Sequence, residues 1–176
     1  MLIQPYSSSW VENFIQLKSK LDAGLKGLAY RIEHVGSTAV PNLDAKPIID
    51  IDIIYYNDVD FGSIKQKLER IGYYHNGNQG IQDRDVFKRN GNTFCNILDT
   101  ISHHLYVCPS HSKALERHIF SRDYFRKNEW ARIKYQEMKY ELAMKAKQNK
   151  KIYATLKEIH VNEFIDAIIE REKKNQ

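Results

Sequence analysis

Residues 48–55, with the sequence IIDIDIIY, constrain the fold and function of this chain more than any other segment. Isoleucine favours a β-strand, and alternate side chains of a strand project from the same face. We therefore expect Asp50 and Asp52 on one face of a buried strand. Neighbouring carboxylates are unfavourable there unless a positive charge compensates them, and Mg²⁺ does so while keeping water and phosphate oxygens as further ligands. A strand with one solvent-exposed face is the alternative, because alternation permits it.

A short Gly-Ser turn precedes this strand and adds to the prediction. Residues 30–35 alternate as a strand does and stop at Gly36-Ser37, and twelve residues separate Ser37 from Asp50. Glycine permits a close approach of the backbone, and a serine hydroxyl and amide can bind a phosphate. The spacing resembles the pattern of the nucleotidyltransferase superfamily, in which Gly and then Gly or Ser precede two acids on a strand. It predicts a metal-nucleotide site with Asp50 and Asp52 as metal ligands.

Two longer stretches are more specific, because residues 31–41 (RIEHVGSTAVP) and 45–52 (AKPIIDID) closely resemble the GrpB family of that superfamily. The resemblance extends over nearly the whole chain, including residues 104–107 (HLYV) on a later strand. Members of the family occur alone or fused to the C-terminus of dephospho-CoA kinase. The resemblance implies a nucleotidyltransferase-like fold, Mg²⁺ as the cofactor and a nucleoside triphosphate as a partner.

The chain departs from the family pattern on that later strand. Members often carry His-Leu-His-Val, whereas this chain has Tyr106 at the second histidine. Active transferases of the superfamily usually add a third acid on a neighbouring strand, as a metal ligand or as the base for the attacking hydroxyl. No acid lies within residues 104–108, and Asp85 and Asp99 are the nearest candidates. A missing third acid would favour nucleotide binding without transfer.

Three further side chains are candidates for binding phosphate or nucleotide. Lys46 lies between the turn and the strand, where it either neutralises a triphosphate or is an exposed loop lysine. His34 precedes the turn, where contact with metal or phosphate and a hydrogen-bonded structural role are equal alternatives. His103 and His104 are adjacent on a strand and therefore point to opposite faces. The family resemblance favours His104 as the one that lines the site.

Other residues of suitable chemistry have simpler explanations. Arg122 and Arg126 share a helical face and could grip a phosphate, but pairing with Asp123 or Glu129 on the protein's own surface is the simpler interpretation. The two cysteines are far apart, which excludes a CxxC zinc site. Four other histidines show no metal-like spacing, namely His75, His111, His118 and His160.

The order of the predicted elements indicates a mixed α/β (α+β) domain. Apolar residues at helical spacing predict a helix after Ser8, a helix over residues 58–71 and helices in the last third of the chain. A hairpin that turns at an Asn-Gly pair is expected over residues 86–97, followed by a strand over 104–108. We therefore expect a single domain over residues 1–176, with a central mixed sheet, helices on one side and a helical C-terminal part.

Charge and hydropathy narrow the classes of partner. The formal net charge is +5, and many of the basic residues lie after residue 120. A basic surface attracts polyanions, yet a solvated helical face is the more ordinary explanation, so RNA is a weaker alternative partner. No run of about 20 apolar residues and no secretion signal is present, so we expect a cytoplasmic protein without a membrane partner.

These features predict a Mg²⁺-dependent nucleotidyltransferase that moves a nucleotidyl group from a nucleoside triphosphate to an acceptor hydroxyl. The alternative is a non-catalytic nucleotide-binding or protein-interaction module on the same fold, motivated by the uncertain third acid and by the fusion to a kinase. The predicted metal ligands, which are also the predicted catalytic residues, are Asp50 and Asp52. The residues predicted to bind nucleotide or phosphate are Gly36, Ser37, Lys46, His34 and His104.

Overall fold

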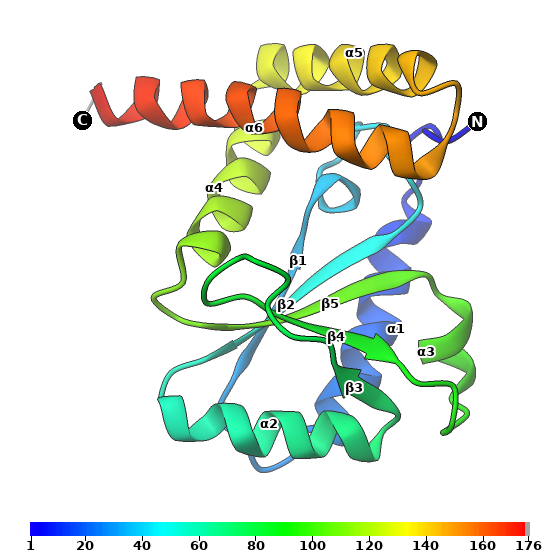
Figure 1. The fold of residues 1–176 in the computed structure, drawn as a ribbon, viewed down its shortest axis with the longest axis vertical. Helices are drawn as coiled ribbons and strands as arrows, with labels where there is room; N and C mark the ends of the chain where they lie inside the picture. Colours follow the sequence, from blue (N-terminus) through cyan, green and yellow to red (C-terminus); the bar gives the residue numbers. More distant parts are fainter. Residues whose placement is uncertain (175–176) are drawn as a thin grey trace.

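A five-stranded mixed sheet forms the centre of the computed structural model, which describes residues 1–174 apart from the side chains of residues 58, 59 and 173. The strands lie in the order β1-β2-β5-β4-β3 (Figure 1). The pair β2–β5 is parallel, whereas β1–β2, β3–β4 and β4–β5 are antiparallel. The strands are β1 (Arg31–Val35), β2 (Ile49–Tyr55), β3 (Tyr73–His75), β4 (Asp85–Arg89) and β5 (His103–Pro109).

Strand β2 carries both aspartates and lies between β1 and β5. Its register places Asp50 between Val35 of β1 and His104 of β5. Asp52 lies beside Tyr106 in the same way. Because side chains alternate along a strand, Asp50, Asp52, His104 and Tyr106 share one face, which we call the Asp face.

The opposite face of the sheet is covered by α1 (Ser9–Gly24), α2 (Asp58–Arg70) and the short helix α3 (Asn96–Thr100). Figure 1 shows α1 behind the sheet and α2 beneath it. Full burial of an Ile or Leu side chain contributes about 1.5–3 kcal/mol, so this layer anchors β2 firmly. The main apolar core is built here from side chains of β2 and the helices, including Ile49, Ile51, Ile53, Leu17, Leu21, Ile64 and Leu68.

Three helices follow β5, namely α4 (Lys113–Lys127), α5 (Glu129–Lys145) and α6 (Lys150–Lys174). They form a second apolar core, which includes Tyr135 of α5 and Tyr153 of α6. Figure 1 shows α5 and α6 side by side across one end of the sheet, with α4 leading up to them. Leu115 of α4 packs on Ile54 of β2 and so covers one end of the Asp face.

The predicted mixed sheet, the helices on one side and the helical C-terminal part are confirmed. Helices α1 and α2 and strand β2 correspond closely to the segments expected from apolar periodicity, and β5 to the strand expected over 104–108. Within residues 1–174, none of the helices combines the length and the apolar character needed to cross a bilayer.

The hairpin expected over residues 86–97 is wrong. β4 pairs with β3 and β5, and the chain beyond the Asn-Gly pair enters α3 instead of a return strand. Arg89 gives the physical reason, because its guanidinium binds the Asp99 carboxylate, with 2.7 Å between Nε and Oδ1, and the carbonyl oxygen of Thr93. These contacts fold the segment back onto the end of β4.

Candidate functional site

Asp50 lies directly against the backbone of the Gly36 turn. Gly36 follows β1 with φ +72° and ψ −171°, a conformation that belongs almost only to glycine. A Cβ atom added at Gly36 would lie 2.3 Å from Oδ2 of Asp50. The pairing of Val35 with Asp50 explains this contact, since Gly36 is the next residue along. The missing side chain at position 36 therefore makes room for the Asp50 carboxylate.

The other oxygen of Asp50 is bound by His104 from the neighbouring parallel strand. Nδ1 of His104 lies 2.8 Å from Oδ1 of Asp50, and about half of the His104 side chain remains exposed. Burial by itself raises the pKa of Asp50, but the hydrogen bond and charge of His104, with Lys157 and His118 adding to them, hold that pKa below its ordinary value. Asp50 is therefore an anion at neutral pH.

Asp52 is fully buried and only half satisfied by hydrogen bonds. Its Oδ2 lies 2.8 Å from Nδ1 of His118 on α4, whereas its Oδ1 has no hydrogen-bond partner among the described residues. The Asp52 side chain is 0% exposed, while His118 is 26% exposed. Because a buried carboxylate oxygen without a partner is unfavourable, this atom marks a place where a ligand can bind.

The two carboxylates fit a cation that takes most of its ligands from elsewhere. Within residues 1–174, no group of three or more His, Cys, Asp or Glu side chains is arranged to hold a metal, and neither aspartate forms an ion pair with a lysine or arginine. Mg²⁺ needs no such group, because it is usually bound through one or two carboxylates and completes its octahedron with water and substrate phosphates. The unpartnered Oδ1 of Asp52 and the Oδ2 of Asp50 beside Gly36 are consistent with that use.

A lysine from the last helix reaches the Gly-Ser turn through a tyrosine. The Ser37 hydroxyl donates to the Tyr135 hydroxyl over 3.4 Å, and Lys157 of α6 also forms a hydrogen bond with Tyr135. Tyr135 chiefly, and then Tyr153 and Asp50, raise the pKa of Lys157 above its ordinary value although burial opposes this. Lys157 is therefore a firmly charged cation beside the predicted phosphate position.

Lys46 lies on the same side of the site. Its Nζ is 5.1 Å from the centre of the Tyr153 ring, and the side chain is half-buried. Burial, together with the nearby charges of Lys157 and Lys150, lowers the pKa of Lys46, while Asp50 opposes that shift. Neither Lys46 nor Lys157 forms a salt bridge with an acid of the described residues, so both charges are available to an anionic ligand.

His34 has structural contacts on both sides of its ring. The ring stacks on Phe14 with 4.6 Å between the centroids, and Nε2 lies 3.1 Å from the Thr38 hydroxyl. That hydroxyl is also within 3.3 Å of the Ile48 carbonyl oxygen. These contacts correspond to the hydrogen-bonded structural role that was one of the two alternatives for His34, because they fix the position of the turn.

Acid should destabilise the protein through His34. Burial chiefly, with the charges of Arg126 and Arg122, lowers the pKa of His34 from 6.5 to about 4, although Asp50 opposes the shift. A base whose pKa is lowered by folding stabilises the protein only while it is neutral, so this contribution is complete above pH 6.5 and lost as the pH falls to about 4. The loss is about 3 kcal/mol in the free energy of unfolding.

Urea titrations at pH 7 and pH 4 measure this loss. We expect His34→Gln to show a smaller drop between the two pH values than the wild type, because glutamine does not titrate. His160→Gln, at an exposed position on α6, is the matched control and should keep the full drop. An equal acid loss in the His34 variant and the wild type would contradict the assignment.

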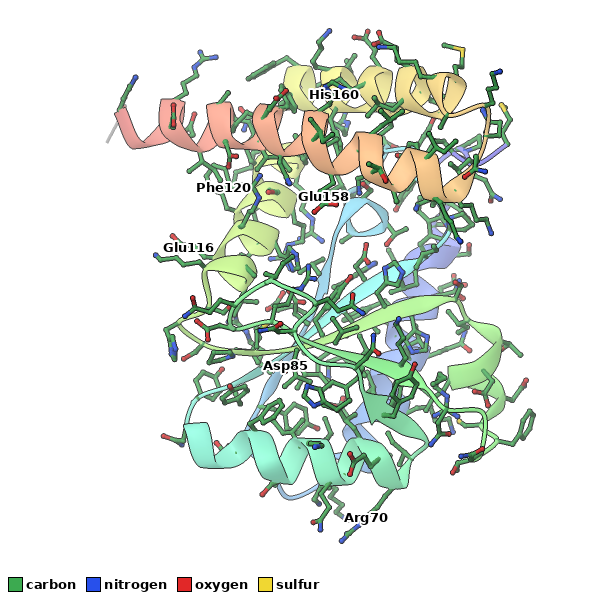
Figure 2. All side chains as sticks on the ribbon, in the orientation of Figure 1. Arg70, Asp85, Glu116, Phe120, Glu158 and His160 are labelled. Atoms are coloured by element: carbon green, nitrogen blue, oxygen red, sulfur yellow. The ribbon has the colours of Figure 1, made fainter. Side chains whose placement is uncertain are left out.

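Neither of the acids proposed for the third position reaches the Asp face. β5 places His104 and Tyr106 beside the two aspartates. Asp85 binds His75 with 2.6 Å between Oδ1 and Nε2, and Figure 2 shows Asp85 on the side of the sheet toward α2. Asp99 forms a salt bridge with Arg89 at the end of β4. In the described part of the chain, an imidazole and a phenol therefore stand where we sought a carboxylate.

Arg122 and Arg126 are used within the protein. Arg122 binds Glu33 of β1 and Asp123, and the guanidinium of Arg126 donates to the carbonyl oxygen of Ala39. The predicted pairing with Asp123 is therefore present, and the arginines fasten α4 to the turn region.

Two residues of the site had no signal in the sequence. His118 contacts Asp52 across 66 positions of sequence, and Lys157 approaches the turn from the last helix. Both arrive through the packing of helices on the sheet, which no local spacing reveals. An apolar stripe predicts that α4 or α6 exists but does not fix which polar residue faces the site.

The whole chain resembles proteins of one family. The family model described as GrpB protein matches residues 1–171. Glutamate-rich protein GrpB of Alkalihalophilus pseudofirmus is 28% identical over 168 residues, which cover 94% of this chain and 94% of that protein. UPF0157 protein YqkA of Bacillus subtilis is 31% identical over 138 residues, and the match covers 78% of this chain but 38% of YqkA.

Solved structures extend the comparison to the fold. The crystal structure of conserved protein GrpB from Enterococcus faecalis superposes with a TM-score of 0.78 and 27% identity, covering 97% of this chain and 98% of that one. Cid1 poly(U) polymerase, solved bound to MgATP, superposes with a TM-score of 0.58 over 84% of this chain and 46% of its own, at 13% identity. The fold is therefore that of the nucleotidyltransferases.

Proposed function

This chain belongs to the GrpB family, and from that premise we propose that it binds a Mg²⁺-complexed nucleoside triphosphate on its Asp face and transfers the nucleotidyl group to an acceptor hydroxyl. The observation that carries the proposal is the arrangement of Asp50 and Asp52. One carboxylate lies against a turn whose backbone conformation strongly favours glycine, and the other has a buried oxygen without a hydrogen-bond partner in residues 1–174. Both features favour a cation beside phosphate oxygens.

The chain's own residues supply the phosphate contacts. The hydroxyl of Ser37 and the charges of Lys46 and Lys157 lie on the β1 and α6 side of the carboxylates, where the β- and γ-phosphates would bind. When bound, Mg²⁺ would neutralise the phosphate oxygens and favour in-line attack. Holding the reactants in this geometry and neutralising their charge are the two contributions to rate that the site can make.

His104 is placed to act as the base. Its Nδ1 is within hydrogen-bond distance of Oδ1 of Asp50, which favours the tautomer with a proton on Nδ1 and leaves Nε2 as an acceptor. In the proposed reaction the acceptor oxygen forms a bond to the α-phosphorus, the bond to the bridging oxygen breaks and pyrophosphate leaves. The proton of the acceptor hydroxyl passes to Nε2 of His104, with Asp50 holding the ring as in other acid–histidine pairs.

Binding and transfer can be measured separately with the wild-type protein. We expect nucleoside triphosphates to bind at least about 10-fold more weakly after a chelator removes Mg²⁺, because the carboxylates then repel the phosphates. Pyrophosphate release with a panel of small alcohols, tRNA and proteins as acceptors then tests transfer. Binding that is indifferent to Mg²⁺ would contradict the proposed site.

A non-catalytic nucleotide-binding module is the second candidate. The observation that favours it is that β5 places His104 and Tyr106, not a carboxylate, beside the two aspartates. The carboxylate that β1 places beside Asp52, Glu33, is already bound by Arg31 and Arg122. Tight, Mg²⁺-dependent nucleotide binding without pyrophosphate release for any acceptor would support this candidate over the transferase.

A further inference from the structure

Two buried polar side-chain atoms have no hydrogen-bond partner in the described residues, Oδ1 of Asp52 and Nε of Arg84. Asp52 is explained by the proposed metal site, but Arg84 is not. Arginine and aspartate atoms of this kind would normally pair with each other, and these two do not. Each of these two atoms can therefore bind a ligand of its own.

Arg84 reaches the Asp face from the segment that joins β3 to β4. Its guanidinium carbon lies 4.8 Å from the centre of the Tyr106 ring. Tyr106 stands between Asp52 of β2 and Val86 of β4 in the sheet register. Figure 1 draws the β3–β4 segment across the front of the sheet, on the side opposite α1.

The environment of Tyr106 shows that these groups are close together. Burial chiefly raises the pKa of Tyr106, and the negative charges of Asp50 and Asp52 raise it further. The positive charge of Arg84 opposes this shift. Arg84 and the two carboxylates thus all lie near Tyr106, and neither aspartate forms an ion pair with Arg84. Stacking on the phenol ring fixes the plane of its guanidinium.

Arg84 differs from the other half-buried arginines of the sheet and α4. Arg89 binds Asp99, and Arg122 binds Glu33 and Asp123. Arg84 has no hydrogen bond or salt bridge with any described residue. A partly buried cation without an anion is unfavourable in the free protein, so an oxyanion that reaches it gains a strong, charge-assisted interaction.

The positively charged side chains of the site lie on two opposite sides of the carboxylates. Lys46 and Lys157 adjoin the Gly-Ser turn on the β1 side, whereas Arg84 lies on the β4 side, beyond β5. A hollow of about 510 Å³ reaches His104 and Tyr106 from the start of β5, and its wall continues along Leu98 and Asp99 of α3. Arg84 does not line this hollow and adjoins it through the Tyr106 ring. This volume suits a small molecule, and its wall includes the proposed base.

We propose that Arg84 binds an anionic group, a phosphate or a carboxylate, on the acceptor substrate, so that the acceptor is a small hydroxyl compound carrying a negative charge. This inference rests on the proposed function, because only a transferase has an acceptor substrate. The guanidinium of Arg84 would bind the anionic group, while the hydroxyl of the same molecule lies beside His104. The nucleotide phosphates occupy the other side.

Three matched probes test the charge requirement on the full chain: glycerol 3-phosphate, glycerate and glycerol. We expect at least one of the two anions to bind roughly 10- to 100-fold more tightly than glycerol, the range expected for hydrogen bonds to a charged group. Which anion binds better identifies the acceptor's charged group. Equal, weak binding of all three by the wild type would overturn the inference.

Arg84→Gln should remove the preference for the anion, and Arg84→Lys should keep part of it. Arg70→Gln is the control, because Figure 2 shows Arg70 at the end of α2 far from α5 and α6. The preference should survive in Arg70→Gln. An undiminished preference in Arg84→Gln, or an equal loss in Arg70→Gln, would overturn the assignment, and circular dichroism checks that each variant is folded.

Competition separates this inference from the proposed function. A saturating Mg²⁺ complex of a non-hydrolysable triphosphate should leave the anion bound, since the two ligands occupy different sides. Displacement would place the anion in the nucleotide's phosphate site and overturn the acceptor assignment. If no nucleotide binds at all, the proposed function fails, while the effect of Arg84→Gln on the anion still tests Arg84 as an oxyanion site.

Discussion

Gly36→Ala is expected to lower both the stability of the protein and its affinity for nucleotide. The φ of +72° and ψ of −171° at Gly36 cost a residue with a side chain about 1–3 kcal/mol in backbone strain. The new Cβ would also lie 2.3 Å from Oδ2 of Asp50, so either the turn or the carboxylate must move. We expect the free energy of unfolding to fall by at least that strain, and Mg²⁺-nucleotide affinity to fall at least about 10-fold.

Gly91→Ala separates strain from contact. Gly91 also has a positive φ, of +73°, but a Cβ atom there would meet nothing within 4 Å. This control should lose stability, as measured by urea unfolding, and keep the affinity of the wild type for nucleotide. A Gly36 variant that binds nucleotide as tightly as the Gly91 variant would show that the close approach of Asp50 to the turn is unimportant.

The sequence predicted the parts of the site that depend on local pattern. Alternation in residues 48–55 placed Asp50 and Asp52 on one face, because they alternate with Ile49, Ile51 and Ile53, which are buried on the other. The same rule separated His103 from His104. His103 binds the Tyr73 hydroxyl, with 2.6 Å between Nε2 and the oxygen, on the face covered by α1, whereas His104 binds Asp50.

The parts that depend on long-range packing were not predictable from local pattern. His118 has no metal-like spacing to any histidine, yet α4 brings it to Asp52. The Asn-Gly pair of residues 90–91 is typical of hairpins, but Arg89 binds the segment beyond it and favours a short helix. In both cases a side-chain contact that no sequence pattern reveals decides the outcome.

Asp50→Asn combined with Asp52→Asn should preserve the fold. An asparagine oxygen can still accept the hydrogen bonds from His104 and His118, and the change removes two neighbouring negative charges. We therefore expect the free energy of unfolding to change by less than about 1 kcal/mol. Circular dichroism and urea titration give this baseline for the binding experiment.

The affinity of this double variant for a non-hydrolysable nucleoside triphosphate, titrated with and without Mg²⁺, tests the central claim most directly. The wild type should bind more tightly when Mg²⁺ is present. The double variant should lose this Mg²⁺ dependence altogether, with at least a roughly 10-fold weaker affinity in Mg²⁺, because neutral amides are poor ligands for a hard cation. Mg²⁺-dependent binding that is unchanged in the folded double variant would contradict the claim that Asp50 and Asp52 hold the metal.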